Sequence, residues 1–120
     1  MSGARIAGLA PQRAPFEVRH DFCPGIYART TFLPADTVAG ARSHLTQHFF
    51  VLVKGSCTVI DSSGERLFIE APHMGIVMPG TSHALHVHED SIYTSFHATD
   101  LTDIEEIERT IVAQTFGPLN

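Results

Sequence analysis

The chain has 120 residues, of which 43% are hydrophobic and 18% are charged, and its formal net charge is −5. This length fits one domain with its own core, and this composition excludes a wholly disordered chain. An acidic chain without a basic patch has no general attraction to nucleic acid or anionic membranes, so neither is expected as a partner. No apolar run approaches the ~20 residues of a membrane span, and no signal-peptide pattern is present, so we expect a cytoplasmic protein.

Residues 1–20 combine small residues, two prolines and three arginines, and we expect an extended arm there. Such an arm is either a loosely ordered terminus or a segment that reaches a neighbouring subunit. The first strand is expected at 26–33, where β-branched and aromatic residues are frequent and Pro34 ends the run.

The middle of the chain has the pattern of short strands separated by turns. They are expected at 44–60 (interrupted by Lys54-Gly55), 66–70, 75–78, 83–88 and 91–97. The segment 61–64, Asp-Ser-Ser-Gly, has the composition of a hairpin loop. The strands 83–88 and 91–97 are expected to pair as a hairpin around Glu89-Asp90.

The segment 101–116 changes to helical spacing, with apolar residues three or four positions apart. These are Leu101, Ile104, Ile107 and Ile111. Thr102 followed by Glu105 has the pattern of a capping box, and Gly117-Pro118 would end the helix. We therefore expect an all-β barrel over 21–100 closed by a C-terminal helix over 101–116.

The chain contains eight histidines, and their placement is informative. His44 and His48 share one face of an extended segment, because alternate residues of a strand point the same way. In a straight strand they lie ~13 Å apart, too far to share a metal ion. Either the strand bends between them, or it begins after His44, which then comes from a loop.

The second group of histidines follows Pro79-Gly80. Alternation places His83 on one face of its strand, with His86 and His88 on the other. Across the expected hairpin, Ile92, Thr94 and Phe96 share the face of His83, and His97 points away. His73, His86 and His88 are assigned mainly to solvent. Imidazoles of this kind are common ligands of transition metals, and they are equally common as ordinary polar residues of a sheet or a wet barrel mouth.

Two segments resemble the sequence motifs of the cupin superfamily. Arg42-Ser-His44-Leu-Thr-Gln-His48, followed by six residues and Gly55, resembles the first motif, with Arg42 in place of a histidine and His48 in place of a glutamate. Gly75-Ile-Val-Met-Pro79-Gly80-Thr-Ser-His83 resembles the second motif, one residue tighter. The resemblance covers about 26–99 and implies a jelly-roll barrel.

The resemblance also implies a site. His44, His48 and His83 would be the ligands of a divalent transition metal such as Zn, Fe, Ni or Mn, and Arg42 and Tyr27 would orient an anionic ligand. A more distant likeness, to cupin-fold sugar-nucleotide keto-isomerases, implies histidine chemistry without a metal.

A closer resemblance is to small stand-alone cupin-like proteins of tailed phages and prophages. Stretches that carry it are Ile26-Tyr-Ala-Arg29, Thr46-Gln-His48, Glu70-Ala-Pro72 and His97-Ala-Thr-Asp100. This likeness implies an assembly or virion-associated module with a histidine-lined pocket, forming a homo-oligomer and meeting other virion proteins. The alternative is a metal-dependent or histidine-based small-molecule enzyme of the isomerase, dioxygenase or sugar-nucleotide type.

Overall fold

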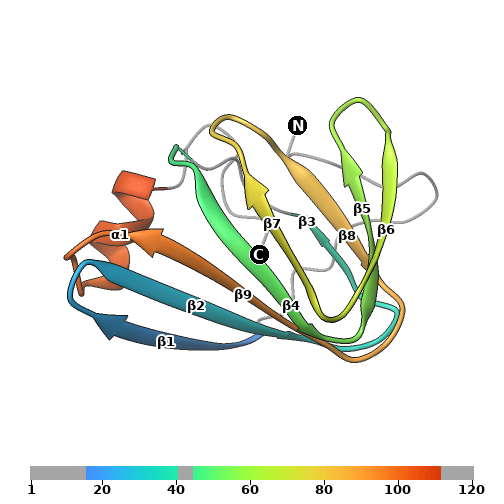
Figure 1. Cartoon of the computed structure of the whole chain (residues 1–120), viewed down its shortest axis with the longest axis horizontal. Helices are drawn as coiled ribbons and strands as arrows, with labels where there is room; N and C mark the ends of the chain where they lie inside the picture. The colour runs from blue at the N-terminus through green and yellow to red at the C-terminus, as the bar shows by residue number, and fades with distance from the viewer. Residues whose placement is uncertain (1–15, 41–44, 112–120) are drawn as a thin grey trace.

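The computed structural model describes residues 16–40 and 45–111, which form two antiparallel sheets and a helix (Figure 1). One sheet has the strand order β1-β2-β9-β4-β7, and the other has the order β3-β8-β5-β6. The strands are β1 (Glu17–Cys23), β2 (Ile26–Leu33), β3 (Val38–Gly40), β4 (His48–Lys54), β5 (Ser56–Asp61), β6 (Arg66–Glu70), β7 (His73–Val77), β8 (His83–Val87) and β9 (Ser91–Ala98). The helix is α1 (Ile104–Ile111).

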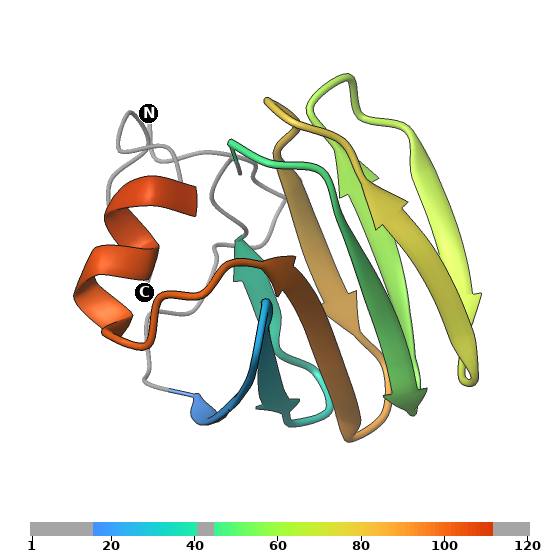
Figure 2. The same ribbon diagram turned by 60° about the vertical axis from the view of Figure 1, so that its left-hand side comes forward.

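The path of the chain is that of a jelly roll. Only β1–β2 and β5–β6 are neighbours both in sequence and in a sheet, and every other connection between consecutive strands passes from one sheet to the other. Figure 2 shows the two sheets facing one another, with α1 beside one end. The predicted fold class, an all-β jelly roll followed by a helix, is confirmed.

The predicted hairpin around Glu89-Asp90 is wrong. β8 pairs with β3 and β5, whereas β9 pairs with β2 and β4 in the opposite sheet. The connection is anchored by other loops: Ser56 Oγ donates to Glu89 Oε2 over 2.8 Å, and the Ala35 amide donates to Asp90 Oδ1 over 2.9 Å. These bonds hold the connection where it crosses between the sheets.

The predicted strand boundaries hold in several places. β2 and β6 have the predicted bounds, while the 44–60 stretch is divided into β4 and β5. β4 begins at His48, and residues 45–47 are not strand, so an unbroken strand from 44 is wrong. β1 includes residues 17–20, the end of the predicted arm, whereas residues 1–15 lie outside the described part of the chain.

Two motif glycines have steric reasons to be glycine. Gly55 has φ +94°, and a Cβ there would lie 2.1 Å from Ser91 Oγ and 2.7 Å from the Asp90 carbonyl oxygen. Gly75 lies opposite Phe50 in the β4–β7 pair, and a Cβ there would lie 2.6 Å from the Phe50 ring. The first glycine makes the tight passage from β4 to β5, and the second makes room for an aromatic ring between the sheets.

The apolar core lies between the sheets. Leu52, Cys57 and Val87 have the largest fully buried side chains among the described residues, and Ile69 packs with the first two. Each belongs to the inward-facing alternate residues of its strand, which is the arrangement expected for a sandwich. Burying a leucine or valine side chain contributes roughly 1.5–3 kcal/mol.

The helix covers one end of the barrel. Ile107 and Ile111 are buried against Tyr27 of β2, and the partly buried Leu101 and Ile104 pack beside them, as the spacing predicts. The first helical hydrogen bond runs from the Ile107 amide to the Asp103 carbonyl, over 2.9 Å. Asp103 is therefore the N-cap, and the prediction of a capping box starting at Thr102 is wrong by one residue.

The predicted end of the helix at 117–118 lies outside the described residues. In the part of the chain that the structure describes, no helix is long and apolar enough to cross a membrane.

Candidate functional site

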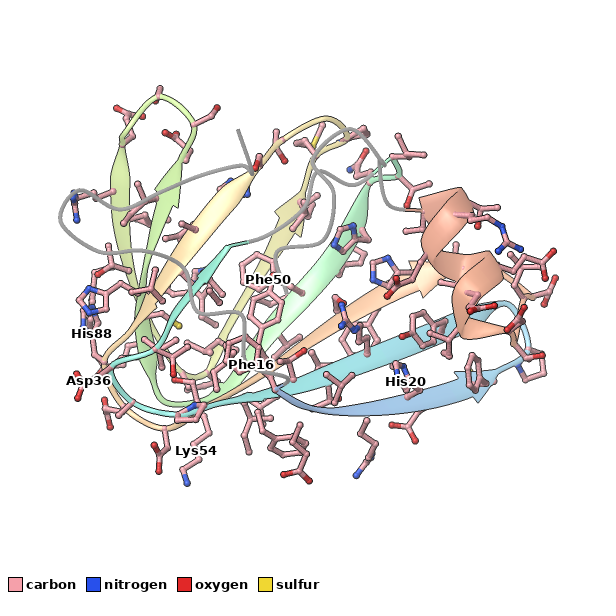
Figure 3. All side chains as sticks on the ribbon, turned by 180° about the vertical axis from the view of Figure 1, so that it is seen from behind. Phe16, His20, Asp36, Phe50, Lys54 and His88 are labelled. Atoms are coloured by element: carbon pink, nitrogen blue, oxygen red, sulfur yellow. The ribbon has the colours of Figure 1, made fainter. Side chains whose placement is uncertain are left out.

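The inward-facing side chains at the helix-covered end of the barrel are polar. Tyr27 near the start of β2 pairs in register with His97 near the end of β9, and His48 is the first residue of β4. His20 of β1 stands opposite Arg29 of β2. We call His20, Tyr27, Arg29, His48 and His97 the polar end of the barrel. In Figure 3, His20 lies at this end, while Phe50 points into the space between the sheets farther along β4.

His48 and His97 are in direct contact. Their ring centroids are 4.3 Å apart, and the two residues are only 6% and 3% exposed. His48 Nδ1 donates to the Thr46 carbonyl oxygen over 3.1 Å, so a neutral His48 carries its lone pair on Nε2. Burial lowers the pKa of His48, partly offset by the bond to Thr46. His48 is therefore a neutral imidazole at neutral pH, in contact with a second imidazole.

Tyr27 links this pair to the surface. Its ring stacks on His97, with centroids 5.8 Å apart, and on Phe22 at 5.2 Å. A 2.6 Å hydrogen bond joins its hydroxyl to His20 Nδ1, and His20 is exposed. Burial raises the pKa of Tyr27, so its hydroxyl remains protonated at neutral pH. Tyr27 thus lies between the buried His97, on which its ring stacks, and the exposed His20, to which its hydroxyl is hydrogen-bonded.

Arg29 is half-buried on the same inward face as Tyr27, two residues away on β2. It stands opposite Ser95 of β9, whose hydroxyl lies 3.0 Å from His97 Nε2. Arg29 is not among the predicted site residues. Strand alternation could have found it, because Arg29 shares a face with the predicted site residue Tyr27.

His97 is the second residue that sequence reasoning missed. It was predicted to point away from the site, and it is instead buried in the polar end of the barrel. The error follows from the wrong hairpin, because pairing β9 with β2 and β4 turns Ser91, Ser95 and His97 inward.

The predicted solvent exposure of three other histidines holds only in part. The prediction that His73 faces solvent is wrong, since His73 is half-buried opposite Leu52. Its ring lies 5.9 Å from that of Phe50, measured between ring centroids. His88 is exposed as predicted, and His86 is half-buried beside it, with ring centroids 4.8 Å apart.

Two of the three predicted metal ligands, His48 and His83, belong to the described residues. His48 and His83 come from opposite sheets and belong to the same end of the barrel, since His48 pairs with Val77 at the end of β7 and β8 starts at His83. Burial lowers the pKa of His83, and the neighbouring Asp61 acts in the opposite direction. Arg42 and His44 lie outside the described residues. Over 16–40 and 45–111, no three His, Cys, Asp or Glu side chains are placed to hold a metal ion.

Comparisons with known proteins bear on the fold. The sequence matches no protein-family model and no curated protein. The structure is similar to salicylate 1,2-dioxygenase from Pseudaminobacter salicylatoxidans, with TM-score 0.63 and 18% identity over 92% of this chain and 31% of that one.

Two smaller proteins are similar over most of their own length. KdgF from Halomonas sp. has TM-score 0.59 and 16% identity over 72% of this chain and 79% of that one. A cupin-2 domain containing protein from Shewanella frigidimarina has TM-score 0.57 and 10% identity over 69% and 80%. At such identities the likeness concerns the fold, and with the jelly-roll strand order it shows that this chain has the cupin fold.

Proposed function

We propose that the polar end of the barrel is a small-molecule site in which His48 and His97 transfer protons. The carrying observation is the 4.3 Å contact of two buried imidazoles. Burying two titratable rings side by side costs stability that apolar residues would not cost, so the pair is best explained by its chemistry.

Isomerisation by proton transfer is the reaction class that this geometry fits best. His48, neutral and with its lone pair on Nε2, would accept a proton from a carbon next to a carbonyl group. His97 would return a proton at the neighbouring atom. Two imidazoles in contact resist carrying two positive charges at once, which suits one ring as base and the other as acid. Tyr27 and His20 would then exchange the proton with solvent.

Deuterium incorporation tests this proposal. A panel of small ketones, aldoses and keto acids is incubated with the full chain in D2O, and mass gain at carbon is followed by mass spectrometry. We expect at least one compound to exchange faster with the protein, and His48→Gln or His97→Gln to slow that exchange by about 10²–10⁴-fold. The matched control His88→Gln, on the exposed outer surface, should retain the wild-type rate.

If no compound in the panel exchanges faster than in buffer, or if the double variant retains the exchange, the proton-transfer proposal is wrong.

Two observations support a metal-dependent version of this site. The lone pair of a neutral His48 is on Nε2, where it could bind a metal ion, and His48 and His83 lie at the same end of the barrel. With His44 these residues would hold a Zn, Fe, Ni or Mn ion, which would supply Lewis-acid chemistry at the same place. Metal analysis of protein purified without a His-tag tests it. Stoichiometric metal that is lost in His83→Ala and retained in His88→Ala is expected, and metal-free protein would exclude this version.

A second candidate function, self-assembly, is favoured by an outer apolar face on β4, β7, β9 and the residue that follows β7. It consists of uncharged side chains that point away from the core, each more than one third exposed. They are Phe49, Val53, Met74, Ile76, Met78 and Phe96. Together they expose on the order of 600 Å², given roughly 150–250 Å² for a whole aromatic side chain.

A second copy of this chain is the occupant that we propose for the outer apolar face. Two such faces would bury about 1,200 Å², the lower end of stable interfaces. Because none of the six side chains is charged, two copies with net charge −5 could meet there without placing like charges in contact. The expectation of a phage or virion context stays a prediction.

Sedimentation of the full chain tests this. We expect a wild-type dimer, a monomeric Met74→Glu variant and a dimeric Phe68→Glu control, since Phe68 is equally apolar and exposed but lies on β6 of the other sheet. A monomeric wild type, or a dimeric Met74→Glu variant, would contradict the proposal.

A further inference from the structure

Arg29 is a half-buried charged residue on the inward face of β2. Within the described residues no hydrogen bond or ion pair reaches its guanidinium, and its Nε atom is buried. Among the described residues, an ion pair joins Arg19 and Asp21 on the surface. Glu108 of α1 is near enough to raise the pKa of His20 and of Tyr27.

A partly buried guanidinium with an unpartnered buried donor lowers the stability of the folded protein. A guanidinium remains charged at every pH at which the protein is folded, so it cannot reduce the cost of burial by losing its proton. Buried polar atoms of charged side chains are ordinarily hydrogen-bonded, and the buried Nε of Arg29 is not. A donor left unused in the empty protein is expected to bind an acceptor group that arrives from outside.

The surroundings of Arg29 define that group. On the inward face its strand neighbours are His20 of β1 and Ser95 of β9, and Tyr27 lies two residues along β2. Burial lowers the pKa of His20, and the Arg29 charge lowers it further. Among these four side chains, the guanidinium of Arg29 is the cationic group. The neutral imidazole of His20, the hydroxyl of Ser95 and the phenol of Tyr27 can each donate a hydrogen bond.

We propose that Arg29 binds the carboxylate or phosphate group of a small molecule at the polar end of the barrel. The planar guanidinium matches two oxygens of such a group, and Ser95 and Tyr27 are placed to donate to the same oxygens. The anion would be held on β2 and β9, leaving the remainder of the molecule beside His48 and His97. This assignment rests on the proposed small-molecule site, and it adds the class of ligand.

Thermal unfolding of the full chain with three probes of similar shape tests the assignment. Benzoate carries a carboxylate, phenyl phosphate carries a phosphate, and benzamide carries neither charge. We expect at least one anion at millimolar concentration to raise the melting temperature by about 4 °C or more, and benzamide to leave it unchanged. The two anions separate carboxylate from phosphate recognition.

Substitutions then locate the effect. Arg29→Met should abolish the shift, Arg29→Lys should weaken binding about tenfold by losing the planar fork, and Arg66→Met, an exposed arginine on β6, should retain the shift. Without ligand, the Arg29→Met chain should melt at or above the wild-type temperature, since a buried Nε–H without a hydrogen-bond partner is removed.

Three results would overturn the assignment. They are equal effects of anions and benzamide on the wild type, an anion shift retained in Arg29→Met, and an Arg29→Met chain that melts well below the wild type. The last result would mean that Arg29 stabilises the fold itself. Failure here is distinct from failure of the proton-transfer proposal, because deuterium exchange reports on His48 and His97 whether or not an anion binds.

Discussion

Two halves of the barrel interior can be compared on a single strand. β4 presents His48 and Leu52 on the same inward face, four residues apart. Leu52 packs in a core cluster with Cys57 and Ile69, whereas His48 touches His97, whose ring stacks on Tyr27. Strand alternation places His48 and Leu52 on the same face, so the difference between them comes from the residues that surround each side chain.

The difference shows how a small barrel can hold a reactive site. The apolar half supplies most of the burial that stabilises the fold, and the polar end contains buried groups that cost stability. Helix α1 adds apolar burial at the polar end, because Ile107 and Ile111 pack against Tyr27. Substitutions in each half should therefore have effects of different size and kind.

The largest expected effect is in the apolar half. Leu52→Ala removes a fully buried side chain and should lower the free energy of unfolding by about 3–5 kcal/mol, measured by denaturant unfolding. Val53→Ala, the next residue, points outward and should cost much less. Equal losses for the two variants would remove the basis for calling this half the core.

Gly55→Ala should come next, at about 2–3 kcal/mol, because the new Cβ meets the Asp90 carbonyl oxygen in a backbone conformation that alanine rarely adopts. Gly25 has a similar φ of +82° with no atom within 4 Å of a new Cβ. Gly25→Ala therefore measures the conformational cost alone, about 1 kcal/mol. The further loss in Gly55→Ala measures the clash of the new Cβ with Ser91 and the Asp90 carbonyl oxygen. If both substitutions cost the same, the packing of Gly55 against Ser91 does not contribute.

The polar end should make stability depend on pH. Burial lowers the pKa of His48, His83 and His20 below 6.5, so near that pH the folded chain binds fewer protons than the unfolded chain. Stability should therefore be greatest above about pH 7 and decrease as the pH falls through 6.5. Denaturant midpoints between pH 7.5 and roughly 5.5 measure this, and His48→Gln should reduce the slope. Stability that is constant or rises on acidification would contradict it.

The smallest effect is expected on the outer surface. His88 is exposed and hydrogen-bonds to Thr58 Oγ1 over 2.7 Å. His88→Ala should change the free energy of unfolding by no more than about 0.5 kcal/mol in denaturant unfolding. A larger loss would show that the outer surface of the β3-β8-β5-β6 sheet contributes to stability in a way that burial does not explain.

The sequence determined the class of fold and many of its elements. β-branched and aromatic runs between turn residues located β2 and β6, and the spacing of Leu101, Ile104 and Ile107 located the buried face of α1. The glycines of the two cupin-like motifs were informative because a Cβ would clash with Ser91 and the Asp90 carbonyl oxygen at Gly55, and with the Phe50 ring at Gly75. These features depend on neighbours close in the chain or on the alternation of a strand.

The candidate site was predicted only in part. Tyr27 and His48 were selected, and both are buried at the polar end of the barrel. His44 and Arg42 lie outside the described residues, so the metal set with His83 stays a prediction. His97 was assigned to the wrong face, and Arg29 was passed over.

Tertiary structure decided the rest. Alternation tells which residues of one strand share a face, but not which face is inward, because that depends on the strand's partners. For β9 the partners are β2 and β4, which are distant in sequence, and the crossing at 88–90 is held by bonds to Ser56 and Ala35. The unpartnered Nε of Arg29 is likewise a property of the folded barrel, since only folding removes water from that atom without supplying an acceptor from the described residues.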